Sequence, residues 1–274
     1  MISFLYFILP VLGGYTLTSV YLLKNPHILH KRKHTTFYCK HISHRGGSGE
    51  RIESTMEAFT HAVEQGTEML EMDCHLTHDG YVVVSHDENL LRQTGHDVTI
   101  SSLNLQDLPL YKERLEVTFY AGRYSSGTDR NFALLEDVFK KFPETPVSIE
   151  IKENNHQLIE KNGSMPYSFT MSRGMLLLLL YYTGLLPFVP IGESLLQFYL
   201  PRIMNRYDCR SVFSALTMRK SLFKHLSARG IQVHLFVCNT DEDIKAALEV
   251  GATGVMSDYP ALLSNYLCRN RSQD

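Results

Sequence analysis

The stretch from His41 to Asp87 restricts the fold of this 274-residue chain more than any other. It reads HISHRGGSGERIESTMEAFTHAVEQGTEMLEMDCHLTHDGYVVVSHD. A strand is predicted over Glu68–Leu76, because apolar and polar residues alternate along it. One face carries Leu70, Met72, Cys74 and Leu76, and the other carries Glu71, Asp73 and His75. The apolar face must be covered by helices, which favours an α/β fold.

Glu71 and Asp73 are two carboxylates on one strand face, and they repel each other. A divalent cation removes that repulsion, and hard oxygen ligands of this kind suit Mg²⁺ or Ca²⁺. A polar edge of an antiparallel sheet that faces solvent produces the same pattern. These residues alone leave both interpretations open.

Two histidines, His44 and His86, each follow a predicted strand. A histidine in this place suits general acid/base chemistry, because its pKa lies near neutrality. The plain alternative is a surface histidine, since the chain has 13 of them. In a parallel barrel the strand ends converge on one face, which would bring both imidazoles to Glu71 and Asp73.

A helix is predicted over Thr55–Gln65, between the glycine-rich turn and the carboxylate strand. Ser54 is its expected N-cap, with Glu57 completing a capping box and Gly66 closing the last turn. The apolar residues recur at helical spacing, which gives this helix one face for packing.

A second polar strand face is predicted over Pro146–Lys152, where Ser148, Glu150 and Lys152 alternate with apolar residues. Glu150 can supply a third carboxylate to the same metal. Lys152 can offset negative charge or hold a phosphate oxygen. The alternative is a strand face that is partly exposed and has no chemical role.

Four segments resemble the glycerophosphodiester phosphodiesterase family: HRGGSGE, ESTMEAF, LEMDCHLTHDG and VVVSHDENLLRQTG. The apolar N-terminus and the segment SRGMLLLLLYYTGLLPFVPI are similar to its mammalian membrane-anchored lysophospholipase D members. The resemblance implies an α/β fold of the TIM-like (β/α)₈ barrel type and metal-dependent hydrolysis of phosphodiesters.

The resemblance also implies a role for individual residues. The acid/base positions fall on His44 and His86, and His86 is in addition a possible metal ligand. The metal positions fall on Glu71, Asp73 and Glu150. The phosphate and substrate positions fall on Arg45, Lys152 and Phe236, where Phe236 takes the place of the family's tryptophan. Glu53 matches the glutamate of an E-N-T motif in which Ser54 replaces the asparagine, and it is expected to support the site.

The implied substrates are lysophospholipids, namely lysophosphatidylcholine and N-acyl lysophosphatidylethanolamine. The implied products are lysophosphatidic acid and the free alcohol or N-acylethanolamine, and the implied cofactor is Mg²⁺ or Ca²⁺. Two alternatives stay open: an inactive membrane-bound variant, and a phosphodiesterase of phospholipase C type. Product analysis separates them.

Parts of the family pattern are shortened in this chain. Only residues 155–166 separate the strand with Glu150 from the SFTMSRG segment, and residues 199–218 are also short. The missing length corresponds to about one βαβ unit. We therefore expect a barrel that lacks one or more βα units, with strand number, tilt and shear adjusted to the loss.

The N-terminal segment Met1–Leu23 has no charged side chain, and about 20 apolar residues span a bilayer. A retained anchor is favoured over a signal peptide, because no basic residue precedes the apolar run. A basic linker is expected over residues 24–38, the barrel domain over 39–268 and a tail over 269–274. Within the domain, residues 174–200 are expected to be a membrane-associated, interfacial or re-entrant insertion. The resemblance suggests the endoplasmic reticulum or perinuclear membrane.

Composition narrows the remaining classes. The formal net charge is −2, which gives no basic field for nucleic acid. The five cysteines are odd in number and lack CxxC spacing, so reduced structural thiols are expected. The sequence gives no signal for a protein partner, and the expected partners are the lysophospholipid and the membrane.

Overall fold

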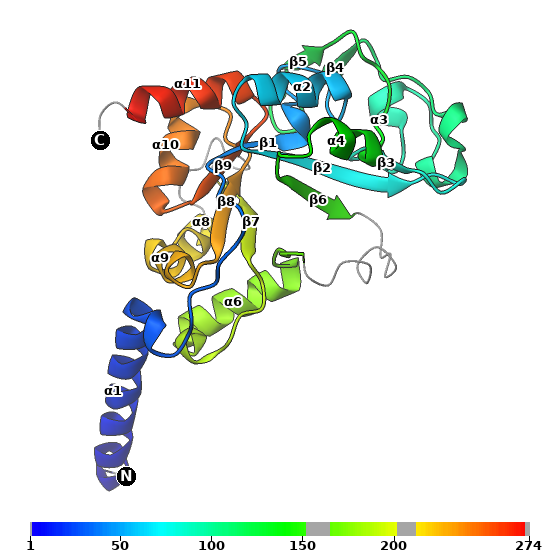
Figure 1. Cartoon of the computed structure of the whole chain (residues 1–274). Coiled ribbons are helices and arrows are strands. Elements are labelled where there is room, and N and C mark those ends of the chain that lie inside the picture. Colours follow the sequence, from blue (N-terminus) through cyan, green and yellow to red (C-terminus); the bar gives the residue numbers. More distant parts are fainter. Residues whose placement is uncertain (1, 152–164, 202–211, 272–274) are drawn as a thin grey trace. The chain divides into compact units, whose positions relative to one another are not determined.

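The computed structural model of the protein describes residues 2–151, 165–201 and 212–271 (Figure 1). Two compact units make up the chain. The first unit contains residues 1–38, 165–234 and 248–253, and the second contains residues 39–164, 235–247 and 254–274. All predicted site residues belong to the second unit, but Lys152 lies outside the described residues.

The sheet of the second unit is built around two neighbouring strands. Strand β1 (His41–Ser43) runs parallel to β2 (Met69–Leu76) on one side and to β9 (Gly254–Ser257) on the other. Strand β6 (Val147–Ile151) runs parallel to β2 as well. Beyond the end of β1, β2 continues and pairs with an antiparallel strand, β3 (Val82–Val84) (Figure 1).

The alternation predicted for β2 is found in the packing. Leu70, Met72 and Cys74 are buried in one cluster with residues of two helices, α2 (Met56–Glu64) and α4 (Leu135–Lys141). The polar face is also covered, because Glu71 is 6% and Asp73 is 1% exposed. This burial excludes the solvent-facing sheet edge as an explanation of the two carboxylates.

Helix α2 begins one residue later than expected. Its N-cap is Thr55, whose hydroxyl accepts a hydrogen bond from the Ala58 amide at 3.1 Å. Ser54 instead adopts a left-handed backbone with φ of 60°. Glu57 does not close a capping box, since it accepts the backbone amides of Thr128 and Asp129 at 2.8 Å each.

The region between β3 and α4 contains a hairpin that the sequence did not reveal. Strands β4 (Arg114–Glu116) and β5 (Tyr124–Ser126) pair antiparallel. The remaining helical elements of the second unit are α3 (Leu91–Thr94), α11 (Pro260–Arg271), most of α10 (Asp241–Val250), and three 3₁₀ turns, His44–Gly46, Ile100–Ser102 and Leu105–Asp107. Helix α11 runs past residue 268, so the expected tail begins inside a helix.

The first unit contains the N-terminal helix α1 (Ile2–Lys24) and a helical layer with strand β7 (Leu195–Tyr199). Its other elements are η1 (Pro26–Ile28), α6 (Met171–Thr183), η5 (Leu186–Phe188), α8 (Val212–Thr217), α9 (Lys220–Ala228) and the first residues of β8 (Gln232–Phe236). The apolar segment 174–200 therefore divides into most of α6, the turn η5 and the strand β7.

The strand inventory agrees with a shortened barrel. The described residues contain nine strands, of which β3, β4 and β5 take part in antiparallel pairs. At most six strands remain for a parallel barrel, fewer than the eight of a complete (β/α)₈ fold. The described residues thus form a TIM-like fold with fewer βα units.

A substitution in the glycine-rich turn tests this packing. Gly47 has φ of +92°, and an added Cβ would lie 2.7 Å from two ring carbons of Pro260. We expect Gly47→Ala to lower the free energy of unfolding by about 2 kcal/mol or more, from backbone strain together with overpacking. Gly80→Ala is the matched control, because its φ is +88° and no atom lies within 4 Å. Thermal unfolding in detergent should show the smaller loss for Gly80→Ala, and equal losses would contradict the close contact with Pro260.

Candidate active site

Three carboxylates converge where β2 and β6 lie side by side. The parallel register pairs Asp73 with Glu150, and Glu71 precedes Asp73 on the same face of β2. One carboxylate oxygen from each of the three lies within 4.8 Å of the others. Glu71 and Asp73 are buried and Glu150 is exposed. The sequence-predicted metal ligands are therefore brought together by the sheet.

The chemistry of this cluster fits a hard divalent cation. Burial and the neighbouring Asp73 carboxylate raise the pKa of Glu71 to about 7. The Arg45 amide donates to Glu71 Oε2 at 2.9 Å, and Arg45 Nε lies 3.7 Å from Asp73 Oδ2. One guanidinium does not balance the carboxylates around it, because Arg45 also pairs with Glu53. An oxygen-only donor set with excess negative charge is what Mg²⁺ or Ca²⁺ binds.

His44 stands at the end of β1 and is oriented by an aspartate from the other end of the chain. Its Nδ1 lies 2.6 Å from Asp258 Oδ1. Asp258 also accepts from Ser48 Oγ at 2.5 Å and from Asn239 Nδ2 at 2.6 Å. Burial alone lowers the pKa of His44, but the Asp258 carboxylate outweighs it and raises that pKa above its usual value. The three hydrogen bonds and His44 hold the pKa of Asp258 low despite its burial.

Aromatic rings flank the His44 imidazole. The ring of Phe236 lies nearly parallel to it, with centroids 6.4 Å apart and an interplanar angle of 10°. Phe119, from the turn between β4 and β5, lies 6.0 Å away. The structure thus places Phe236 beside His44, and its substrate-binding role stays a prediction.

The segment that carries His86 returns to β2 by a route that the sequence did not show. Its strand β3 runs antiparallel to β2, so the chain returns toward Asp73, and the Ser85 amide donates to the Asp73 carbonyl at 2.9 Å. His86 Nδ1 lies 2.6 Å from Asp87 Oδ1. The expectation that parallel strand ends converge explains His44 but is wrong for His86.

Glu53 connects the two sides of the site. It is buried and lies 2.6 Å from Arg92 Nη2, 2.8 Å from Gln93 Nε2 and 3.3 Å from Arg45 Nη1. Arg92 Nε also donates to Asp87 Oδ2 at 2.6 Å. Although burial acts to raise it, the pKa of Glu53 is held low by Arg45 and Arg92. Glu53 therefore links Arg92 to Arg45, whose guanidinium also lies near Asp73.

Four polar residues of this network were missed from the sequence: Asp258, Asn239, Asp87 and Arg92. Asp87 directly follows His86, so an aspartate beside an expected catalytic histidine was an available signal. Asp258 lies 214 residues from His44, and no local pattern connects them. Only the pairing of β1 with β9 reveals that contact.

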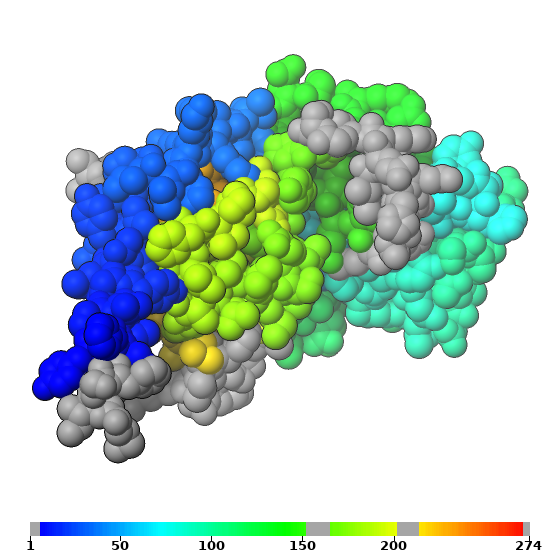
Figure 2. All heavy atoms as spheres, turned by 90° about the horizontal axis from the view of Figure 1, so that it is seen from below, coloured from blue at the N-terminus to red at the C-terminus, as the bar shows by residue number. Residues whose placement is uncertain are grey.

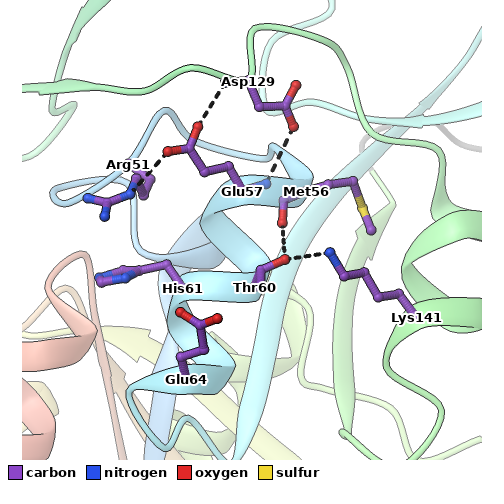
Figure 3. Close-up of a pocket in the computed structure, with 8 residues that line it drawn as sticks. All are labelled: Arg51, Met56, Glu57, Thr60, His61, Glu64, Asp129 and Lys141. Carbon is purple, nitrogen blue, oxygen red and sulfur yellow. Dashed lines mark hydrogen bonds and ion pairs between the residues drawn. The ribbon is translucent and has the colours of Figure 1, made fainter.

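A hollow of about 390 Å³ beside α2 is separate from these residues (Figure 3). Its lining includes charged side chains that pair with one another, as in the 3.3 Å contact of Arg51 with Glu57. Lys141 Nζ donates to Thr60 Oγ1 at 2.8 Å. None of the predicted site residues lines this hollow, so we assign it no catalytic role.

Comparison with known proteins supports the geometry. Residues 44–175 match the glycerophosphoryl diester phosphodiesterase family. Lysophospholipase D GDPD3 from Homo sapiens is 44% identical over 304 residues, covering 96% of both chains. Lysophospholipase D GDPD1 from Homo sapiens is also 44% identical, covering 96% of both chains. The chain belongs to this family. Its members are phosphoric diester hydrolases.

A solved structure agrees on the fold of this family member. Glycerophosphodiester phosphodiesterase from Thermotoga maritima has a TM-score of 0.57 and 22% identity, covering 85% of this chain and 99% of that one. The alignment with human GDPD3 spans 304 residues, more than the 274 of this chain. The relative therefore has residues inside the aligned span without counterparts here, as the shortened family pattern predicts.

Replacing Asp258 tests how His44 is tuned. We expect Asp258→Asn to lower the pKa of His44, because the variant loses the charge that stabilises the imidazolium. The limb of the kcat/KM profile that reports His44 should move to lower pH by about one unit or more. Asp97→Asn, an exposed carboxylate of the same unit, is the control. An unchanged profile would show that Asp258 does not set the protonation of His44.

The same pair predicts how stability depends on pH. Because the pKa of His44 is raised on folding, its contribution is complete below about pH 6.5, the unfolded value, and is lost as pH rises through the folded pKa. Because the pKa of Asp258 is lowered, its contribution is present above about pH 3.9 and lost as pH falls through the folded pKa. Thermal unfolding across pH should show both losses weakened in Asp258→Asn.

Proposed function

We propose that this family member is a lysophospholipase D. It hydrolyses lysophosphatidylcholine or N-acyl lysophosphatidylethanolamine to lysophosphatidic acid and the free alcohol or N-acylethanolamine. The observation that carries the proposal is the convergence of Glu71, Asp73 and Glu150 in the sheet whose strands β1 and β3 lead to His44 and His86. The 44% identity to two proteins named lysophospholipase D supports the substrate class.

The three carboxylates would hold Mg²⁺ or Ca²⁺. When bound, the cation polarises the phosphoryl group and offsets its charge. Arg45 adds a second, buried positive charge, because its guanidinium is fixed between Asp73 and Glu53. We propose that it orients a non-bridging phosphate oxygen. Lys152 remains a proposed second phosphate contact.

The two histidines would move the protons. An aspartate engages Nδ1 of each ring, which leaves Nε2 as the nitrogen directed to substrate. One imidazole removes the proton of the attacking oxygen while the new P–O bond forms. The other protonates the leaving alcohol as its P–O bond breaks. The attacking oxygen belongs to water, or to the neighbouring glycerol hydroxyl in a route through a cyclic phosphate.

The aromatic side chains would position the substrate. Phe236 and Phe119 border His44 with apolar faces, which suit the carbon atoms of the glycerol and its head group. They also limit access of water to the imidazole. We propose that Phe236 takes over the contact that the tryptophan makes in other family members, without an indole N–H donor.

The proposed location is a membrane, with the endoplasmic reticulum as the finer expectation. Within the described residues, Tyr6–Lys24 is long and apolar enough to cross a bilayer. Its exposed side chains include Phe7, Val11 and Leu17, which would face lipid. An enzyme held in this way meets substrates that carry an acyl chain.

One observation favours an inactive variant: at most six parallel strands occur in the described residues. However, the strands that carry the site, β1, β2, β6 and β9, are all present and paired in register. A phospholipase C-type reaction would also use histidines for proton transfer but would release different products. Product analysis therefore decides among the three possibilities.

Turnover of lysophosphatidylcholine by the purified full chain is the direct test. We expect Mg²⁺- or Ca²⁺-dependent release of choline together with lysophosphatidic acid, and a loss of about a hundredfold or more in His44→Ala. Release of phosphocholine instead would indicate a phospholipase C-type reaction. Absence of turnover with every divalent cation would indicate the inactive variant, and full activity of His44→Ala would disprove the proton-transfer role.

Cation binding tests the carboxylate cluster without relying on activity. We expect Glu150→Gln to weaken binding of Mg²⁺ or Ca²⁺ by about tenfold or more in calorimetric titration, since one of three charged ligands is lost. Glu64→Gln, on helix α2, removes a carboxylate outside the cluster and should leave the affinity unchanged. Equal affinities for the two variants would remove Glu150 from the ligand set.

A further inference from the structure

The face of β2 that carries Glu71 and Asp73 has a third polar side chain, His75. His75 is buried, with 4% of its surface exposed. The proposed metal cluster consists of carboxylates and does not use the imidazole. Burial of a polar side chain is unfavourable unless it is hydrogen-bonded. The contacts of His75 therefore show what the residue contributes.

The two ring nitrogens of His75 reach the segment that follows β3. Nε2 donates to the main-chain carbonyl of His86 at 3.3 Å. Nδ1 lies 2.9 Å from Glu88 Oε2. His75 thus connects the strand of the carboxylates to the backbone of the second histidine to which we assign proton transfer.

Glu88 is held from its other side by the next part of the chain. Its Oε1 accepts from the Ser101 amide at 3.1 Å and from Ser101 Oγ at 2.5 Å. The Glu88 carbonyl accepts from the Ile100 amide at 3.0 Å. Residues 86–105 lie at the surface of the second unit, cyan to blue-green in Figure 2. His75 is therefore joined to a surface segment that has hydrogen bonds of its own.

An apolar cluster holds the same segment. Val83, the cross-strand partner of His75, is buried in one cluster with Leu90 and Ile100. Burial of apolar surface stabilises the segment but has no direction. A hydrogen bond, in contrast, fixes both a distance and an angle. The contact of Nε2 can therefore set the place of the His86 carbonyl more closely than the cluster does.

The imidazole of His86 is oriented by Asp87, its neighbour in the chain, with Nδ1 2.6 Å from Oδ1. This contact fixes the ring relative to its own loop and not relative to β2. Two hydrogen bonds join the loop to β2 itself. The Ser85 amide donates to the Asp73 carbonyl at 2.9 Å, and His75 Nε2 donates to the His86 carbonyl. The second comes from a side chain, so substitution can remove it without changing the main chain.

We propose that His75 is a positioning residue for His86, and that its Nε2 sets where the His86 main chain lies relative to β2. This inference rests on the proposed function, which assigns a proton transfer to His86. Such a transfer needs an approach at hydrogen-bond length, and a displacement of about 1 Å can lower the rate by about a hundredfold. His75 acts through the backbone of His86 and exchanges no proton with the substrate.

Two substitutions separate the two contacts of the ring. The amide of glutamine extends as far as imidazole Nε2, so His75→Gln keeps a donor for the His86 carbonyl and loses the approach to Glu88. The amide of asparagine extends only as far as Nδ1, so His75→Asn keeps the approach to Glu88 and loses the His86 carbonyl. His78→Asn, at an exposed position beyond the end of β2, is the matched control.

Steady-state turnover of lysophosphatidylcholine by the full chain measures the effect on the reaction. We expect His75→Asn to lower kcat by about tenfold or more and to leave KM within about twofold, because His86 is displaced. His75→Gln should keep kcat within about threefold of the wild-type value, and His78→Asn should match the wild type. Equal losses in the two His75 variants would overturn the proposal in favour of a packing role, and an unchanged kcat in His75→Asn would overturn it outright.

Cation binding distinguishes an effect on the loop from an effect on the carboxylates. Calorimetric titration with Mg²⁺ and with Ca²⁺ should give His75→Asn the affinity of the wild type, because the proposed ligands are unchanged. A weakened affinity would overturn the proposal, since His75 would then act on the carboxylates of β2 and not on His86.

Hydrogen exchange measured by mass spectrometry reports on the loop without relying on activity. The amides of Ser85 and Leu90 both donate to main-chain carbonyls, so opening of residues 85–90 exposes them to exchange. We expect faster exchange over residues 85–90 in His75→Asn than in His75→Gln, with helix α2 unchanged in both. Identical exchange in the two variants would overturn the proposal. A wild-type chain without turnover would refute the proposed function, and exchange over residues 85–90 would still decide the role of His75.

Discussion

Two buried carboxylates on one strand face are the constraint on which this site depends. Glu71 and Asp73 cannot both be charged in a dry environment without compensation, and the raised pKa of Glu71 shows the cost. Arg45 supplies one compensating charge, but its guanidinium also forms an ion pair with Glu53. The cluster with Glu150 therefore retains an excess of negative charge. A divalent cation would resolve this conflict and would link the stability of the site to its proposed chemistry.

An aspartate holds Nδ1 of each histidine, but the two aspartates come from different parts of the chain. His86 uses the aspartate that follows it in the chain, whereas His44 uses Asp258, which directly follows the last strand. Asp258 is itself held by Ser48 and Asn239, and Asp87 is held by Arg92. Each imidazole is therefore locked at one nitrogen. Fixed rings would suit the proposed transfer of one proton from the attacking oxygen and one to the leaving alcohol.

The shortening of the chain does not fall on the strands that carry this arrangement. Strands β1, β2, β6 and β9 supply His44, the three carboxylates and the support for Asp258, and they pair in register. The lost length lies in the segments between β6 and α9 by comparison with the family pattern. Hydrolytic activity therefore depends on whether the local sheet around β2 is stable without a complete barrel.

The sequence by itself determined the carboxylate face of β2, the strand with Glu150, the two histidines and the apolar N-terminal helix. Each of these follows from a local periodicity, because side chains alternate along a strand and apolar length sets a span. Local patterns were also insufficient at two places. Thr55 caps α2 in place of Ser54, and no sequence pattern indicated the β4–β5 hairpin. Tertiary structure alone decided the antiparallel return of β3, the pairing of Asp73 with Glu150 and the contact of His44 with Asp258. These contacts join segments that lie far apart in the sequence, so no local pattern of residues specifies them.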